Sequence, residues 1–448
     1  MRTPFLALLL ITALPLGAQQ PKPRPNVIVI LTDDQGYEDA GCYGAKDLKT
    51  PAIDRIAAAG VKFTQFYAAS CVCSPSRAGL MTGRYPWKAG LEQNGPGSPS
   101  EAVNDLSTSK EKGGLPAAQV TMAEVFHDAG YATAHIGKWH LGHGDGTKPL
   151  DQGFDYSFGH MGGCIDNWSH FFYWAGPNRH DLWEGNRRVR MPGRFFPDLM
   201  VEKTAAFIEQ HRERPFFIYF AINLPHYPYQ GDPAALEEYA SLPYPRNLYA
   251  ATVSTMDARI GKLLDHLDRL GVRDDTIIVF QSDHGASSEE RAHGGGGSAG
   301  PYRGGKFSFF EGGIRVPAVI SWPAGLPSGE SRDAMAHGCD WLPTLADLCG
   351  VKLPEAPLDG RSLAPVIRSA DAPTPHAHLE WKVGEQWCVR QGPWKLIHRP
   401  KPAGGPPLLA EDKEWFLANI ADDPAESKNR AADHPEIVAK LRKLREEQ

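Results

Sequence analysis

The chain has 448 residues, of which 42% are hydrophobic and 22% are charged. This composition is ordinary for a globular protein, and the length allows one large domain plus a smaller one. The formal net charge of −6 argues against a nucleic-acid partner, so any anionic ligand must be held by local cations.

The N-terminus has the features of an export signal. Arg2 supplies a positive start, residues 5–16 form an apolar run, and Leu16-Gly17-Ala18 resembles a cleavage site. The alternative is the start of a buried helix. The run is too short to span a bilayer, and no later run of this kind occurs in the sequence. We therefore expect residues 1–18 to be a signal peptide and the mature protein to be secreted or periplasmic, without a membrane anchor.

Apolar segments alternate with amphipathic segments along most of the chain. Residues 26–32 form a continuous apolar, β-branched run, which is typical of a strand buried on both faces of a parallel sheet. Further strands are expected over residues 132–136, 216–222 and 276–281, and helices over residues 50–60, 123–130, 199–210, 249–270 and 340–348. This alternation predicts an α/β fold with helices on both faces of a mostly parallel central sheet.

Polar side chains follow several of these strands. Asp33, Lys138, His226 and Asp283 each come at or just after the end of an apolar run. Binding sites in open α/β sheets lie beyond the carboxyl ends of the strands. We therefore expect these four side chains to gather at one edge of the sheet.

The C-terminal part has a different organisation. After a proline-rich stretch, short strands are expected over residues 378–382, 386–390 and 394–398, and a charged amphipathic helix over residues 435–447. This pattern predicts a small antiparallel sheet plus a helix. We place the domain boundary near residue 370, with an N-terminal catalytic domain over residues 19–370 and a C-terminal subdomain over residues 371–448.

The cysteines do not form a disulfide scaffold, because seven cysteines are few for this length. Export permits disulfides, but their pairing cannot be deduced from the sequence. Cys71 and Cys73 have no second ligand cluster nearby, so a zinc site is not supported.

Two acidic pairs are candidate metal ligands. Asp33-Asp34 and Asp283-His284 each follow a predicted strand. Neighbouring side chains of a strand point to opposite faces, so both aspartates reach one ion only if the chain turns, which Gly36 would make easy. Either pair alone is more typical of a solvated turn. Together they predict a site for Ca²⁺ or Mg²⁺, which prefer oxygen ligands.

Four further side chains are candidates for binding an anion or moving a proton. The spacing of Lys138 and His140 predicts that both lie on one face of an extended segment, where a cation and an imidazole suit an anionic substrate. A surface loop would explain either residue alone. His226 and Lys306, each taken alone, are more typical of a structural histidine and a solvated lysine.

The most specific pattern begins at Cys73. The run Cys73-Ser74-Pro75-Ser76-Arg77 is followed by Thr82-Gly83. It resembles the signature of the type I sulfatases of the alkaline phosphatase superfamily, in which the cysteine is oxidised to Cα-formylglycine. Six further segments resemble this family in the same order, namely residues 26–36, 137–142, 224–228, 282–285, 304–317 and 422–429.

This resemblance implies an alkaline-phosphatase-like fold and a metal site. One Ca²⁺ per chain would be bound by Asp33, Asp34, Asp283 and His284, together with the residue made from Cys73. Many members have Asn at position 284, and imidazole is a softer ligand than calcium prefers. The resemblance also implies a formylglycine-generating enzyme as a partner during maturation.

The resemblance implies a role for each catalytic candidate. One hydroxyl of the formylglycine hydrate would attack sulfur, and the other would allow sulfate to be released. Arg77 would steady this residue, and Lys138 and Lys306 would hold the sulfate oxygens.

The two histidines would handle protons. By the same resemblance, His140 would assist deprotonation of the hydrate, and His226 would protonate the leaving alcohol.

The substrate is indicated by an aromatic insertion over residues 164–190. Aromatic faces stack on sugar rings, so this segment could form a saccharide subsite; a packed lid or core loop is the alternative. With an export signal, a sulfated polysaccharide or oligosaccharide is the expected substrate. The aromatic and histidine side chains of the insertion are Trp168, His170, Phe171, Phe172, Tyr173, Trp174, His180 and Trp183.

Two other functions stay open at this point. The first is a phosphoester or phosphonate hydrolase of the same superfamily, because charge and geometry at such sites are similar. The second is a non-catalytic carbohydrate-binding protein with an unmodified Cys73, which the combination of Lys138, His140, His226 and Lys306 argues against.

Overall fold

A computed structural model describes residues 24–174, 176–403 and 406–446 of the chain. The expected signal peptide lies outside these residues. The largest element is a ten-stranded mixed sheet with the order β13-β2-β12-β11-β1-β10-β4-β5-β8-β9. Its strands are β1 (Asn26–Thr32), β2 (Gly60–Phe63), β4 (Ala132–Lys138), β5 (Tyr156–His160), β8 (Trp183–Glu184), β9 (Arg187–Arg188), β10 (Phe216–Ala221), β11 (Thr276–Ser282), β12 (Ala318–Ser321) and β13 (Glu330–Arg332).

The centre of the sheet is parallel. β1 pairs in parallel with β10 on one side and with β11 on the other, and β10 pairs in parallel with β4. The carboxyl ends of these four strands therefore meet at one edge. The four strands predicted from apolar runs are confirmed as these four.

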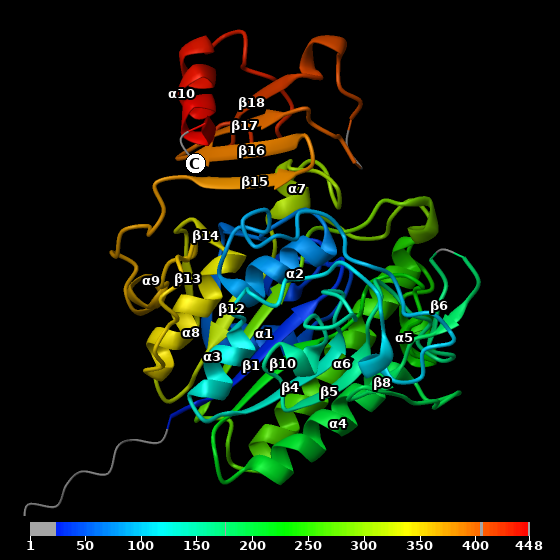
Figure 1. The fold of residues 1–448 in the computed structure, drawn as a ribbon. Helices are drawn as coiled ribbons and strands as arrows, with labels where there is room; N and C mark the ends of the chain where they lie inside the picture. The colour runs from blue at the N-terminus through cyan, green and yellow to red at the C-terminus, as the bar shows by residue number, and fades with distance from the viewer. Residues whose placement is uncertain (1–23, 175, 404–405, 447–448) are drawn as a thin grey trace, which may run out of the picture.

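Helices cover both faces of the sheet (Figure 1). Side chains of β1 alternate between two cores: Val27 and Val29 pack with residues of α2, α3 and α8, whereas Ile28 and Ile30 pack with residues of α1, α4 and α6. The expected α/β fold is confirmed. The helices are α1 (Pro51–Ala58), α2 (Cys73–Thr82), α3 (Met122–Asp128), α4 (Phe196–His211), α5 (Pro233–Glu238), α6 (Arg246–Arg269), α7 (Glu311–Ile314), α8 (Trp341–Cys349) and α9 (Ala364–Arg368).

The C-terminal part forms a four-stranded antiparallel sheet and a helix (Figure 1). The expected antiparallel sheet and helix are confirmed, but the fourth strand, over residues 415–419, was not predicted. Its elements are β15 (Leu379–Val383), β16 (Gln386–Gln391), β17 (Trp394–His398), β18 (Trp415–Asn419) and α10 (Pro435–Glu446). One face packs on α10 through Leu441, and the other packs on Phe309 and Phe310 of the preceding part. The boundary at residue 370 stays a prediction.

A buried ionic cluster joins this small sheet to α7. The Lys395 ammonium of β17 lies 2.7 Å from a carboxylate oxygen of Glu311 and 2.7 Å from one of Glu426. All three side chains are fully buried. The Tyr67 hydroxyl donates a further hydrogen bond to Glu311 (2.6 Å). Because α7 begins five residues after Lys306, this cluster fixes the segment that carries that lysine.

Asp257 of α6 joins two helices, and its replacement gives a prediction. Its carboxylate accepts hydrogen bonds from the backbone N–H groups of Ala52 (2.9 Å) and Ile53 (2.8 Å) in the first turn of α1. We expect Asp257→Ala to lower the free energy of unfolding by about 1–3 kcal/mol, because two buried donors lose their acceptor. Urea unfolding of both proteins measures the difference, and an unchanged midpoint would contradict it.

The loss should depend on pH in a defined direction. Burial raises the pKa of Asp257 from 3.8 to about 7. A carboxyl group whose pKa is raised in the folded state stabilises less as pH rises through this interval. The destabilisation by Asp257→Ala should therefore be largest at the acidic end of the interval and shrink towards pH 7.

All seven cysteines, each within the described residues, are free thiols. Among the residues that the structure describes, no helix combines the length and the apolar character needed to cross a bilayer.

Candidate active site

The end of β1 places two aspartates in the site. β1 ends at Thr32, and Asp34 adopts a left-handed backbone conformation with φ of 64°. The turn that brings both carboxylates to one place is therefore at Asp34 itself, and the expectation that Gly36 supplies it is wrong. Gly36 serves close packing instead, because a Cβ there would lie 2.3 Å from the Ser298 carbonyl oxygen.

Cys73 is the first residue of α2. The positive end of a helix dipole lies at this point, which favours an anion. The helix ends at Gly83, whose left-handed conformation (φ of 65°) suits glycine. Inside the helix, a Cβ at Gly79 would lie 2.4 Å from the Ala69 side chain. Gly83, the glycine of the Cys73 signature, thus ends the helix that presents the cysteine.

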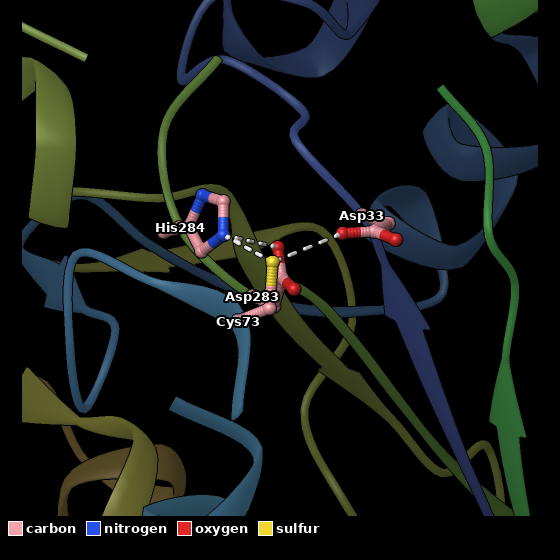
Figure 2. A group of neighbouring side chains, drawn as sticks. All are labelled: Asp33, Cys73, Asp283 and His284. Carbon is pink, nitrogen blue, oxygen red and sulfur yellow. Dashed lines mark hydrogen bonds and ion pairs between the residues drawn. The ribbon is translucent and has the colours of Figure 1, made fainter. Parts of the chain in front are cut away.

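Four side chains converge on one point, as Figure 2 shows. The Cys73 sulfur lies 3.9 Å from an Asp33 oxygen and 3.3 Å from Nε2 of His284. That Nε2 atom lies 3.5 Å from Asp283. Nδ1 of His284 donates to the Gly285 carbonyl (3.0 Å), which leaves Nε2 facing the other three residues.

Three buried cations surround this group. Lys138 contacts Asp33 (2.7 Å), Arg77 contacts Asp283 (2.9 Å), and Lys306 contacts Asp34 (3.0 Å). The three cationic side chains are fully buried. Buried charges persist only when they are paired, so the three carboxylates and the three cations hold one another in place.

His226 lies beside Lys306 and Asp34. Its Nδ1 donates to the Tyr227 carbonyl (2.6 Å), and its Nε2 lies 3.5 Å from the Lys306 ammonium and 3.7 Å from Asp34. Burial lowers the pKa of His226 well below its usual value. The imidazole is therefore neutral at neutral pH.

His140 also faces the site, but not in the way expected. β4 ends at Lys138, and His140 takes a left-handed conformation with φ of 55°. The prediction of one shared face on an extended segment is therefore wrong. Burial lowers the pKa of the His140 imidazole well below its usual value. The nearby charges of Lys138 and Arg77 lower this pKa further, whereas Asp33 raises it. A turn, not an extended segment, brings His140 to the site.

Burial and the neighbouring charges also set the pKa values of Cys73 and Asp34. Burial alone would raise the pKa of the Cys73 thiol, but the Lys138 and Lys306 ammonium groups lower it to about 5. Burial raises the pKa of Asp34 to about 7 against the opposing effect of Lys306. Position 73 thus lies where negative charge is favoured.

The residues present fit a divalent cation. Ligand atoms of Asp33, Cys73, Asp283 and His284 lie within 4.8 Å of one another, and all four residues are buried. The buried Asp34 carboxylate lies beside this group, with its Oδ1 atom 3.5 Å from Nε2 of His284. Three carboxylates suit a hard cation, and the imidazole is the one softer donor. Burial would lower the pKa of His284, but Asp283 raises it to about 9, so a cation there would displace a proton.

The aromatic insertion divides between the core and the site. Trp183 is fully buried, and the Trp168 ring packs against Phe195. The Trp174 ring lies 6.0 Å from the Lys306 ammonium and 6.4 Å from the His226 ring. Trp174 of the insertion therefore borders the catalytic candidates, as a saccharide subsite would require. The burial of Trp183 instead agrees with the alternative of a packed core segment.

Two residues near the site were not predicted. Glu289 accepts a hydrogen bond from the Tyr227 hydroxyl (3.2 Å) and lies 3.5 Å from the Lys306 ammonium. His160 pairs in register with Lys138 and is fully buried. His160 is a polar residue at the end of a strand, which is the same pattern that predicts Asp33, Lys138 and Asp283. Glu289 lies in a polar loop that carries no such signal.

Comparisons with known proteins agree with this arrangement. The family model described as Sulfatase matches residues 25–351, and the model described as N-sulphoglucosamine sulphohydrolase, C-terminal, matches residues 305–448. Human steryl-sulfatase is 31% identical over 451 residues, which cover 85% of this chain and 75% of the relative. An N-acetylgalactosamine-6-O-sulfatase of Bacteroides thetaiotaomicron is 30% identical, with 94% of this chain and 93% of the relative covered.

Solved structures show the same fold. The crystal structure of Ps i-CgsB superposes with a TM-score of 0.82 at 28% identity, covering 95% of this chain and 92% of that chain. A structure of the same protein in complex with k-i-k-neocarrahexaose gives a TM-score of 0.81. The chain therefore belongs to the sulfatase family, with an alkaline-phosphatase-like fold, and it is a sulfuric ester hydrolase.

Proposed function

We propose that this chain hydrolyses sulfate esters of a sulfated polysaccharide or oligosaccharide, with formylglycine made from Cys73 as the nucleophile. The observation that supports this most is the position of Cys73 at a helix start, between buried cations and candidate metal ligands. A glycan substrate is supported by two relatives, one named an N-acetylgalactosamine-6-O-sulfatase and one solved with a neocarrahexaose.

Asp33, Asp34, Asp283 and His284, together with position 73, would hold one Ca²⁺. When bound, the ion would neutralise sulfate oxygens and polarise the sulfur centre. The chain's own cations contribute to the same end. Arg77 pairs with Asp283 (2.9 Å), so it keeps that carboxylate oriented towards position 73.

The two site lysines would hold the sulfate group. The ammonium groups of Lys138 and Lys306 are fully buried, and both charges act on position 73. Fixed cations stabilise charge that develops in the transition state more than they stabilise the substrate. Stabilising this charge would accelerate cleavage of the bond between sulfur and the ester oxygen.

The two histidines would move protons. His226 is neutral before the substrate binds, and a sulfate ester beside it adds negative charge that raises its pKa. A protonated Nε2 then donates to the leaving alcohol oxygen. His140 would accept a proton at position 73 during sulfate release.

The proposed function also requires that Cys73 be converted to formylglycine and that the protein be exported. A formylglycine-generating enzyme would modify Cys73, and residues 1–18 would direct export to the periplasm or the medium. The catalytic domain would extend over residues 19–370, followed by a subdomain over residues 371–448.

The test is desulfation profiling of the protein from its native source on defined sulfated oligosaccharides, with peptide mass analysis at residue 73. We expect loss of one sulfate from at least one oligosaccharide and the mass of formylglycine at residue 73. Parallel assays on phosphate and phosphonate esters provide the comparison. Faster turnover of those esters, or a modified residue 73 without any desulfation, would overturn the proposal.

Removal of the metal gives a separate prediction. We expect prolonged dialysis against EGTA to lower turnover by about 100-fold, because three carboxylates and an imidazole then lack the ion that polarises sulfur. Adding CaCl₂ should restore activity, and circular dichroism should show that the fold persists throughout. Full activity after dialysis, with no metal detected by mass spectrometry, is the contrary result.

A further inference from the structure

A groove lies next to position 73, between the two sheets. It has a volume of about 480 Å³. Val72 and Phe307 line one side of it, and Glu385, Gln386, Arg399 and Lys401 line the other. We call this feature the basic groove.

The basic groove and the catalytic candidates share two peptide segments. Val72 directly precedes Cys73, and Phe307 directly follows Lys306. Phe307 has a left-handed conformation (φ of 73°), and its backbone N–H donates to the Cys71 carbonyl (2.9 Å). This turn separates the Lys306 ammonium, which reaches the site, from the Phe307 ring, which reaches the groove. The groove is thus lined by the chain neighbours of Cys73 and of Lys306, and a second substituent of a bound saccharide would have to pass these two neighbours to enter it.

The charge of the groove is positive. Arg399 and Lys401 follow β17 and are exposed. Glu385, at the turn between β15 and β16, forms an ion pair with Arg399. Within the described parts of the chain, Lys401 has no carboxylate partner, so its charge is uncompensated. The Ser308 hydroxyl donates to the Lys401 carbonyl (2.7 Å), which fixes this segment against the loop that carries Lys306.

An unpaired donor provides a second, independent observation. Gln386 is only 4% exposed, and its Nε2 has no hydrogen-bond partner among the described residues. A buried amide donor without an acceptor costs stability unless a ligand supplies one. Gln386 lines the groove together with Lys401. Lys401 calls for a negatively charged group, and an oxygen acceptor of that group that reaches the Gln386 amide would also satisfy this donor.

We propose that the basic groove binds a second anionic substituent, a carboxylate or a sulfate, of the same saccharide that presents its target sulfate at position 73. This inference rests on the proposed function and adds a specificity determinant to it. Lys401 is the main cation, Gln386 is the hydrogen-bond donor, and Glu385 opposes binding by holding Arg399 and repelling anions. The substrate would then carry at least two negative charges.

The experiment compares probes with one and two anionic groups. The probes are 4-nitrophenyl sulfate, monosulfated N-acetylgalactosamine and N-acetylglucosamine, the corresponding disulfated sugars, and uronate-containing sulfated chondroitin disaccharides. We expect wild type to have a lower KM for a probe with two anionic groups. Lys401→Gln should raise that KM about fivefold more than it raises the KM for singly charged probes. An effect on the disaccharides identifies a carboxylate, and an effect on the disulfated sugars identifies a sulfate.

Glu385→Gln provides a change of opposite sign. It removes the repulsion and frees Arg399, so the KM for the doubly charged probe should fall about threefold. Damage to the fold would not lower KM. Lys440→Gln, an exposed lysine of α10, is the matched control for charge.

Each remaining outcome decides against the proposal. If Lys401→Gln and Lys440→Gln have equal effects, the groove binds no anion. If wild type prefers singly charged probes, the second subsite does not exist. If 4-nitrophenyl sulfate and singly charged sugars are hydrolysed but no doubly charged probe is, the proposed function holds and this inference fails. If no sulfate ester is hydrolysed at all, the proposed function itself fails.

Discussion

Cys73→Ala should abolish turnover of sulfate esters and leave the fold intact. Alanine has neither the thiol that is oxidised nor any oxygen that could attack sulfur, so activity should fall to the uncatalysed background. The side chain is 2% exposed and belongs to the first turn of α2, where alanine is well tolerated. The measurements are turnover of the profiled oligosaccharide and thermal unfolding of both proteins. Retained activity in this variant would rule out the mechanism.

Cys73→Ser separates attack from release. A serine hydroxyl can attack sulfur, but it lacks the second hydroxyl through which sulfate leaves. We expect at most one turnover per chain and a stable sulfate ester at residue 73, detected by peptide mass. Repeated turnover by this variant would show that release does not need formylglycine.

Lys306→Met should lower kcat/KM by about 10²–10³, because a fixed cation is lost where negative charge develops. The ammonium lies 3.0 Å from Asp34 and is fully buried, so water cannot replace it well. The variant should also be less stable, because Asp34 loses its partner. Kinetics should therefore be measured well below the unfolding temperature.

Arg259→Met is the matched control for Lys306→Met. Arg259 of α6 is a buried cation that pairs with Asp198 (3.0 Å) and with Asp232. Its loss should also destabilise the protein, though less, because Asp198 and Asp232 are partly exposed, while kcat/KM of the folded protein stays within about threefold of wild type. Equal losses of activity in both variants would mean that Lys306 acts through stability alone.

Most of the central sheet could be predicted, because long buried strands leave a clear pattern. Residues 27–31 are all apolar, and the strand has the predicted bounds, residues 26–32. β12 (Ala318–Ser321) and β2 (Gly60–Phe63) were not predicted, since four residues are too few to show a period. β5 was missed because Gly159 and His160 interrupt its apolar pattern.

The site could be predicted as a set of residues but not as a geometry. Parallel strands bring their carboxyl ends together, so Asp33, Lys138 and Asp283 had to meet. The left-handed conformations of Asp34 and His140 were not predictable, because such turns favour glycine and depend on tertiary contacts. The approach of Trp174 to Lys306 likewise arises from the path of a long segment.

The cluster of Lys395, Glu311 and Glu426 has a consequence for engineering by recombination. Glu311 lies before the predicted boundary near residue 370, whereas its two partners lie after it. A chimera whose C-terminal sheet comes from a relative without a lysine at the position of Lys395 would bury the Glu311 carboxylate without its counterpart, at a cost of about 3–5 kcal/mol. Crossovers intended to alter substrate preference should therefore fall upstream of Lys306, so that the lysine, α7 and the sheet are inherited as one unit.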